Sequence, residues 1–300
     1  TIAATVQVRV AALSSNVGAA PVLAVVMGAT GVGIAWGPAA AEDTTWARLN
    51  GAVTGAGSVL VPATGNERAT ADATAASGGL LFAGSSAQAT AHVQQDGSNP
   101  TVEASIGSMG VHSTGDVRVD AFMTGEAHAE AIGVTVGGVG AIGGATIADA
   151  DFAPVVLSSV DSNITSTSGG IGLSASLNAS PTGTNLGPAN SVYANAIAVA
   201  ASAIVGVCGA EANAHDHSIV HAFVPSYATL SGGASALSSG PSAGKGIAVL
   251  TTSFTQPKAN TDGITVGGLF TKGKSDASAI WNGSTRSNLD GTVTSGASLR

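Results

Sequence analysis

The sequence has few charged and few aromatic residues. Charged side chains make up 9% of the 300 residues and aromatic side chains 4%, whereas an average globular chain is about 25% charged. A core built on Phe, Tyr and Trp is therefore excluded. Disorder is disfavoured as well, because disordered chains combine low hydrophobicity with high net charge, and hydrophobic residues here reach 44%.

Basic residues are scarce and gathered late in the chain. Ten Lys and Arg stand against 18 Asp and Glu, for a net charge of −8. All lysines lie in the last fifth of the sequence, at Lys245, Lys258, Lys272 and Lys274. Because nucleic-acid binding needs clustered basic residues that displace counterions, we expect no nucleic-acid partner.

Cysteine is almost absent. The single residue, Cys208, excludes an internal disulfide and a cysteine metal cluster, and we interpret it as a small buried hydrophobe. The chain begins at Thr1 without a visible signal peptide and ends at Arg300 after a strand-like stretch. We therefore expect it to be part of a longer protein.

Small residues are abundant, and they follow a period of two. The chain has 42 Gly, and Ala, Ser and Thr fill much of the remainder. In 116–121 Val alternates with Asp and Arg, and in 69–75 Ala alternates with Thr and Asp. This alternation predicts strands with one buried face. Helix is disfavoured by the Gly, Val, Ile and Thr content, so the expected fold class is all-β.

The strand patterns recur in order along the chain. An alternating strand, a Gly/Ser turn, a second strand and a long Ala/Gly-rich run appear in each copy. Equivalent points spaced by 56, 53, 65 and 66 residues are Trp46, Val102, Val155, Val220 and Arg286. The predicted division is a partial repeat at 1–45, repeats at 46–99, 100–153, 154–218 and 219–284, and the start of a further repeat at 285–300. The two longer repeats contain the loop insertions 178–190 and 238–245.

Stacked repeats predict an elongated β-solenoid or β-helix-like fold, because one repeat cannot bury its own apolar face. The long Ala/Gly-rich runs are expected to project from this stack as paired β-hairpins. The alternative, a low-complexity linker, is disfavoured by the ordered placement of Val, Ile and Leu.

One stretch, Pro21 to Ala41, is apolar and long enough to cross a membrane as a helix. The corresponding stretches of the next copies, 71–91, 131–151 and 196–215, contain polar or charged residues. Since equivalent segments share one environment, we expect no transmembrane span here.

Few residues suggest chemistry. His215 and His217 share a strand face and His221 follows, which makes these three the candidate metal ligands. Zinc or copper needs a third ligand and supporting contacts, and no comparable His pair recurs elsewhere in the sequence, so we interpret them as solvated loop residues. Calcium at Asp149, Asp151, Asp161 and Asn163 is a further option. We find no catalytic motif and predict that the chain is not an enzyme, with no bound cofactor and no identified ligand-binding residues.

The repeat resembles the passenger repeats of giant bacterial filamentous adhesins, the filamentous-haemagglutinin-like and autotransporter-type proteins, including the leukotoxin-like filamentous adhesins. The resemblance rests on 102–106 with 115–121, on 155–160 with 170–175, and on the breaks Gly137-Gly138 and Gly143-Gly144. It implies an extracellular or cell-surface location, a fibre-like shape and a role in adhesion or extracellular matrix.

Three functions follow as hypotheses. The first is a structural segment that self-associates, head-to-tail or laterally, through its strand edges. The second is a ligand-binding adhesin module that recognises a host or neighbouring cell through exposed aromatic residues, for which the candidates are Tyr193, Phe223, Tyr227 and Trp281. The third is a β-helical polysaccharide-processing enzyme, which requires clustered carboxylates.

Overall fold

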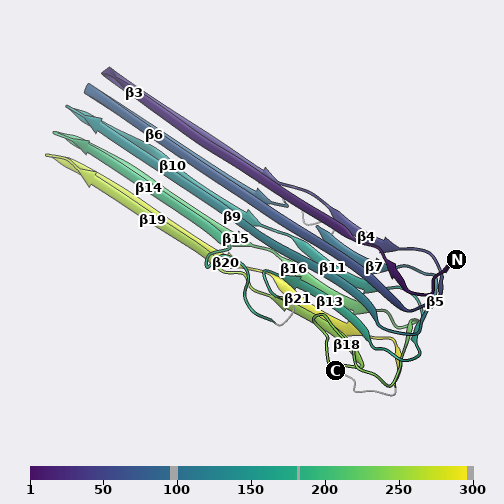
Figure 1. Cartoon of the computed structure of the whole chain (residues 1–300). Coiled ribbons are helices and arrows are strands. Elements are labelled where there is room, and N and C mark those ends of the chain that lie inside the picture. The colour runs from purple at the N-terminus through teal and green to yellow at the C-terminus, as the bar shows by residue number, and fades with distance from the viewer. Residues whose placement is uncertain (95–100, 181–182, 296–300) are drawn as a thin grey trace.

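The structure is a computed structural model that describes residues 1–94, 101–180 and 183–295. Over these residues the chain is all-β and contains no helix. The strands form three sheets, and every ladder between named strands is parallel. Figure 1 shows the longest strands running side by side away from the end that holds both termini.

Two small sheets lie at the base of the molecule. The first consists of β1 (Ile2–Ala3), β5 (Val53–Ala56), β8 (Val111–Ser113), β12 (Ile164–Ser166), β17 (Thr229–Gly232) and β22 (Thr292–Ser295). The second consists of β4 (Thr45–Leu49), β7 (Val102–Ile106), β11 (Val155–Val160), β16 (Ile219–Val224) and β21 (Ser284–Leu289).

The third sheet is large and has 11 strands. It contains β2 (Gln7–Arg9), β3 (Ala12–Ala41), β6 (Ser58–Val93), β9 (Val117–Gly137), β10 (Gly140–Phe152), β13 (Ile171–Leu177), β14 (Val192–Ser202), β15 (Val205–Asp216), β18 (Ile247–Ser253), β19 (Pro257–Val266) and β20 (Phe270–Trp281). The chain passes through the sheets in a fixed order. From β7 it crosses to β8, runs out along β9, turns, returns along β10 and reaches β11, which lies beside β7. We call one such circuit a coil.

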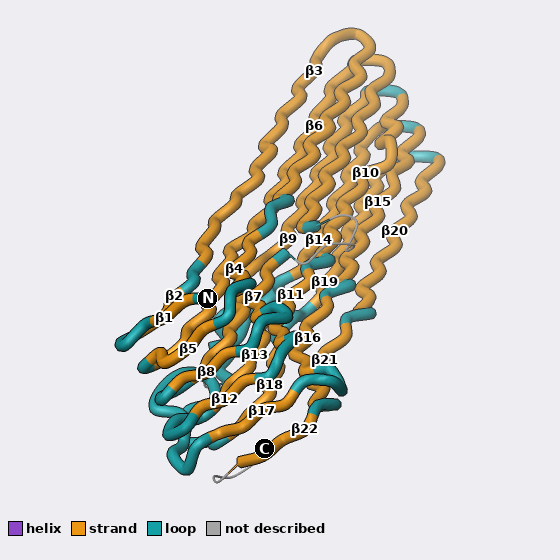
Figure 2. Tube along the Cα trace, turned by 90° about the vertical axis from the view of Figure 1, so that its right-hand side faces the viewer, coloured by secondary structure: helices purple, strands orange, loops and turns teal. Residues whose placement is uncertain are grey.

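The Ala/Gly-rich runs project as strand–turn–strand arches, and not as hydrogen-bonded hairpins. The outgoing limb β9 pairs with β6, β13 and β14, while the returning limb β10 pairs with β6 and β15. The expectation of paired β-hairpins is therefore wrong. Each limb already has neighbouring coils on its edges, so its main-chain groups bond along the stack, and no ladder joins β9 to β10 in the described residues. Figure 2 shows the arch tips following one another at one end.

Alanine fills the interior of the arches because two layers of the large sheet face each other there. Ala69, Ala71 and Ala73 are buried, whereas the intervening Thr70 and Asp72 point outward, as the period of two demands. Larger side chains lie mainly nearer the base, and the largest that are fully buried include Phe152, Ile106, Met123, Ile164, Ile171, Leu173 and Leu177. The core residues therefore become smaller where the base, which has three sheets, gives way to the arch, which has two facing layers of the large sheet.

The Gly pairs singled out in the sequence lie at the tip and at a bulge. β9 ends at Gly137, and a Cβ on Gly138 would overlap the Leu80 carbonyl oxygen of the preceding coil. The amide of Gly138 instead donates to the carbonyl of Gly79 at 2.9 Å. Gly143 and Gly144 lie where the register of β10 shifts, between Ile142 and Ala145.

The strand registers give the true equivalences between coils. Trp46 lies beside Glu103, and Val102 lies beside Val156. Each differs by one residue from the equivalence that the sequence suggested. A displacement of one residue exchanges inward and outward faces. The alternating Val/Ala pattern alone does not determine the register between neighbouring strands.

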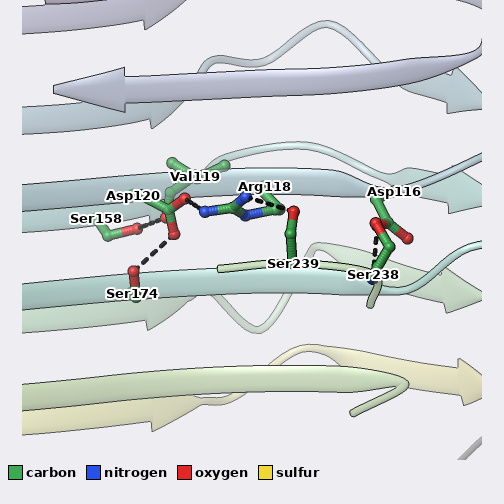
Figure 3. A network of polar contacts seen from close by, with 8 residues as sticks. All are labelled: Asp116, Arg118, Val119, Asp120, Ser158, Ser174, Ser238 and Ser239. Atoms are coloured by element: carbon green, nitrogen blue, oxygen red, sulfur yellow. Dashed lines mark hydrogen bonds and ion pairs between the residues drawn. The ribbon is translucent and has the colours of Figure 1, made fainter. Parts of the chain in front are cut away.

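Both insertions lie between strands. The first, at 178–191, lies between β13 and β14 of the large sheet, and the second, at 233–246, connects β17 of the first small sheet to β18 of the large sheet. A polar network fastens the second loop to the base (Figure 3). Asp116 accepts a hydrogen bond from the Ser238 amide at 2.9 Å, and Arg118 donates to Ser239 at 3.0 Å while it pairs with Asp120. Ser174 of the neighbouring strand also donates to Asp120, at 2.7 Å.

Within the part of the chain that the structure describes, no helix has the length and apolar character needed to cross a membrane. The apolar stretch Pro21 to Ala41 lies within the strand β3.

Candidate functional site

A polar depression lies on the outer face of the outgoing limbs, where the first insertion loop passes over the sheet. It has a volume of about 480 Å³. Residues 188–190 of the loop form one side. The strands contribute the rest, from β6, β9, β14 and β19: Arg68, Glu126, His128, Glu130, Tyr193 and Lys258. We call this feature the limb depression.

Asn178 holds the start of the loop that overhangs the limb depression. Its side-chain Oδ1 accepts a hydrogen bond from the amide of Gly125 at 2.8 Å, and its Nδ2 donates to the carbonyl of Gly125 at 3.1 Å. The Asn178 backbone has a φ of 53°, a conformation that Asn tolerates better than most residues. The buried amide thus continues the β9 ladder at the point where the main chain departs.

Side chains from successive coils form rows across the depression. In one row Arg68 of β6 forms an ion pair with Glu126 of β9 at 2.5 Å. In the next row the rings of His128 and Tyr193 lie with centroids 4.8 Å apart, and the ammonium of Lys258 lies 5.9 Å from the Tyr193 ring. Each row follows from the parallel register, which places equivalent outward residues side by side.

The third row brings two carboxylates together. Asp72 and Glu130 are direct neighbours in the register, and Asn195 donates to Glu130 Oε1 at 3.1 Å. One ligand atom from each of Asp72, His128 and Glu130 lies within 4.8 Å of the other two. Unlike Glu126, neither Asp72 nor Glu130 forms an ion pair within the described residues. Three metal-ligating groups therefore share one small area of surface.

The sequence did not reveal this cluster, although a signal existed. His128 and Glu130 are two residues apart on a strand and so share a face. Asp72 belongs to the preceding copy, which the sequence aligned so that Ala71 matched Ala131. The structure pairs Ala71 with Ala129 and thereby brings Asp72 beside Glu130.

The predicted metal ligands lie on the returning limb and just after it, where β15 is followed by β16. The rings of His215 and His217 are 6.0 Å apart, and His217 Nδ1 lies 3.4 Å from Asp151 Oδ1. His221 packs against Phe223 with ring centroids 5.2 Å apart. These three histidines do not form a group of three converging ligands in the described part of the chain, and metal binding there stays a prediction.

The residues that the sequence suggests as calcium ligands form contacts with the following coil. Asp149 accepts a hydrogen bond from Asn213 at 2.8 Å, and Asn163 accepts one from the amide of Thr229 at 2.8 Å. Asp161 lies 3.4 Å from the Tyr227 hydroxyl. Their oxygens thus take part in coil-to-coil contacts, and a calcium ion at these positions stays a prediction.

The aromatic residues considered for ligand recognition differ in exposure. Tyr227 and Trp281 are exposed, and Phe223 is half-buried. Trp36, in β3 at the opposite end of the stack, is a further exposed aromatic residue. Tyr193 is half-buried, and of the four candidates it alone lines the limb depression.

Glu67 is an ionisable group that lies inside the arch. Glu67 is fully buried on the inward face of β6, and neither of its carboxylate oxygens has a hydrogen-bond partner of normal geometry in the described residues. Burial, reinforced by the nearby negative charge of Asp43, raises the pKa of Glu67 to about 7, and the neighbouring amide of Asn16 acts in the opposite direction. Glu67 is therefore a costly group to keep charged in the folded chain.

Searches against protein-family models, curated proteins and solved structures return no match for this chain.

Proposed function

We propose that the chain is a segment of a β-solenoid in a very large bacterial surface or secreted protein, and that its role is structural. The observation that carries the proposal is the coil-to-coil register. From β6 to β9, β14 and β19, equivalent residues lie side by side along the whole limb. Such a stack extends by the addition of identical rungs, because each coil buries its faces only against its neighbours.

The two ends of the stack support assembly. Among the described residues, β3 pairs only with β6 and β20 only with β15, so each presents a row of main-chain groups that a further strand can bind. The outer faces of β3 are also apolar, with Leu23 71% exposed and Trp36 64% exposed. The residues beside them in the next coil are polar, Thr74 and Gln88. A further coil that pairs with β3 would cover these apolar side chains.

The dimensions of an assembled fibre follow from the strands. The 21 residues of β9 span about 70 Å at roughly 3.3 Å per residue, and neighbouring coils lie about 4.8 Å apart. A head-to-tail stack of this chain is therefore a ribbon whose width is set by the arches. The extracellular location and the role in adhesion or matrix rest on the resemblance to filamentous adhesins.

Light scattering and electron microscopy of the isolated chain test the proposal. We expect ribbons that lengthen with concentration. Leu23→Lys with Trp36→Lys places charges at the open edge and should suppress assembly. Thr74→Lys with Gln88→Lys is the matched control, since it places the same charges one coil further in and should leave assembly intact. Monodisperse monomers of the unmodified chain at all concentrations would contradict the proposal.

A second candidate function is ligand recognition at the limb depression. The observation in its favour is that the insertion loop covers polar and aromatic side chains from four strands there. Screening a glycan and peptide array with the chain and with Tyr193→Ala tests it. Binding that is unaffected by Tyr193→Ala would rule out this surface.

A further inference from the structure

We propose that Asp72, His128 and Glu130 bind a divalent transition-metal ion, Zn²⁺ in the first instance, on the outer face of the arch. The three residues come from two successive coils, Asp72 from β6 and the other two from β9. A bound ion would therefore link one coil to the next outside the main-chain ladder.

The donor set selects the class of metal. It offers one imidazole nitrogen and two carboxylate oxygens, and imidazole suits zinc, copper, iron and nickel, whereas magnesium and calcium prefer oxygen ligands alone. Three protein ligands with a water molecule in the fourth position are a common arrangement for zinc. The cluster contains no thiolate, which disfavours the softer ions such as Cu(I).

The geometry needs little adjustment. Zinc bonds to nitrogen and oxygen of about 2.0–2.2 Å place tetrahedral ligand atoms about 3.4 Å apart. The three ligand atoms already lie within 4.8 Å of one another. Asp72 is exposed, while His128 and Glu130 are half-buried. Small side-chain rotations thus close the site without any movement of the strands.

Electrostatics favours a cation at this position. Asp72 and Glu130 are adjacent across the ladder, and like charges in such a pair destabilise a sheet. Two rows away the equivalent problem does not arise, because Arg68 faces Glu126. The row of Asp72 and Glu130 lacks such a basic residue in the described chain, so a divalent ion would supply the missing positive charge.

Two neighbours already orient the ligands. Asn195 of the following coil donates a hydrogen bond to Glu130 at 3.1 Å, and the ring of Tyr193 lies against His128. Outer contacts of this kind fix the direction of metal ligands, and their loss usually weakens metal binding about 10–100-fold. The cluster thus has supporting contacts as well as the ligands themselves.

Calorimetric titration of the untagged chain with Zn²⁺ tests the proposal. We expect one ion per chain, with the dissociation constant raised at least about 100-fold by His128→Gln or Asp72→Asn and about 10–100-fold by Asn195→Ala. The matched control is His215→Gln with His217→Gln, which removes two histidines elsewhere and should leave the affinity unchanged. All these side chains point outward from the strands or lie in a loop, and circular dichroism verifies that each variant is folded.

Three results would overturn the assignment. They are absence of zinc binding by the unmodified chain, retention of full affinity in His128→Gln, and loss of binding in the His215 and His217 double variant. The visible spectrum of the Co²⁺-loaded chain gives an independent reading. Intense bands of a four-coordinate ion that disappear in His128→Gln support the site, whereas the weak spectrum of six-coordinate Co²⁺ contradicts it.

Discussion

Replacement of Glu67 by Gln should make the fold more stable at neutral and alkaline pH and remove a pH dependence that the native chain has. The carboxyl has a pKa of about 7 in the folded chain against an ordinary value of 4.5. At 1.36 kcal/mol per pH unit, this difference corresponds to about 3 kcal/mol.

The direction follows from where the proton is bound. Below pH 4.5 both folded and unfolded chains hold the proton, so the carboxyl does not disfavour folding. Between pH 4.5 and 7 the unfolded chain releases a proton that the folded chain keeps, and the free energy of unfolding falls as pH rises. Above pH 7 the deficit is complete and constant, because both states are ionised.

Denaturant unfolding followed by circular dichroism measures the effect. We compare Glu67→Gln with the unmodified chain at about pH 4 and about pH 8.5, and expect their difference in unfolding free energy to change by about 3 kcal/mol in favour of Gln. A constant cost of burying the Gln amide cancels in this comparison. Glu211→Gln, at an exposed position, is the control and should change stability by less than about 0.5 kcal/mol. A difference between Glu67→Gln and the unmodified chain that does not vary with pH would refute the reasoning.

Two further predictions concern the interior of the arch. Ala131→Leu adds bulk to a fully buried position between the two limbs of the arch and should lower the free energy of unfolding by about 1–3 kcal/mol or more. The outward Thr74→Leu should change it by less than about 0.5 kcal/mol. Equal effects of the two substitutions in denaturant unfolding would contradict a core between two layers. Cys208 is 3% exposed and burial raises the pKa of its thiol, so we expect a thiol reagent to react slowly with the folded chain and rapidly in denaturant. Rapid labelling under native conditions would show that the returning limbs open.

Much of the fold could be predicted from the sequence because its elements follow a simple rule. The period of two in 116–121 indicates strands, and β9 begins at Val117 as that pattern requires. The pattern also predicts that the long Ala/Gly-rich runs project from the stack, but as paired hairpins and not as arches. Sequence alternation shows which residues point inward, but it does not show which strand supplies the hydrogen bonds.

The candidate site is harder to predict from the sequence than the fold, for a related reason. Its ligands belong to two different coils, so their proximity depends on a register that alternating small residues leave open by one or two positions. His215 and His217 are predicted as candidate metal ligands because they are close in sequence. Asp72 and His128 are 56 positions apart in the numbering, and only the ladder between β6 and β9 brings them together.

The parallel ladders also give the molecule an unequal resistance to force. Between two successive coils every main-chain rung points along the stacking direction, so tension applied evenly in that direction is carried by all rungs at once. Tension applied at an arch tip acts on the few rungs nearest Gly138 first and transfers to the next only after these break. A fibre built from such coils therefore resists tension along its length but separates more easily when force is applied at the arch tips.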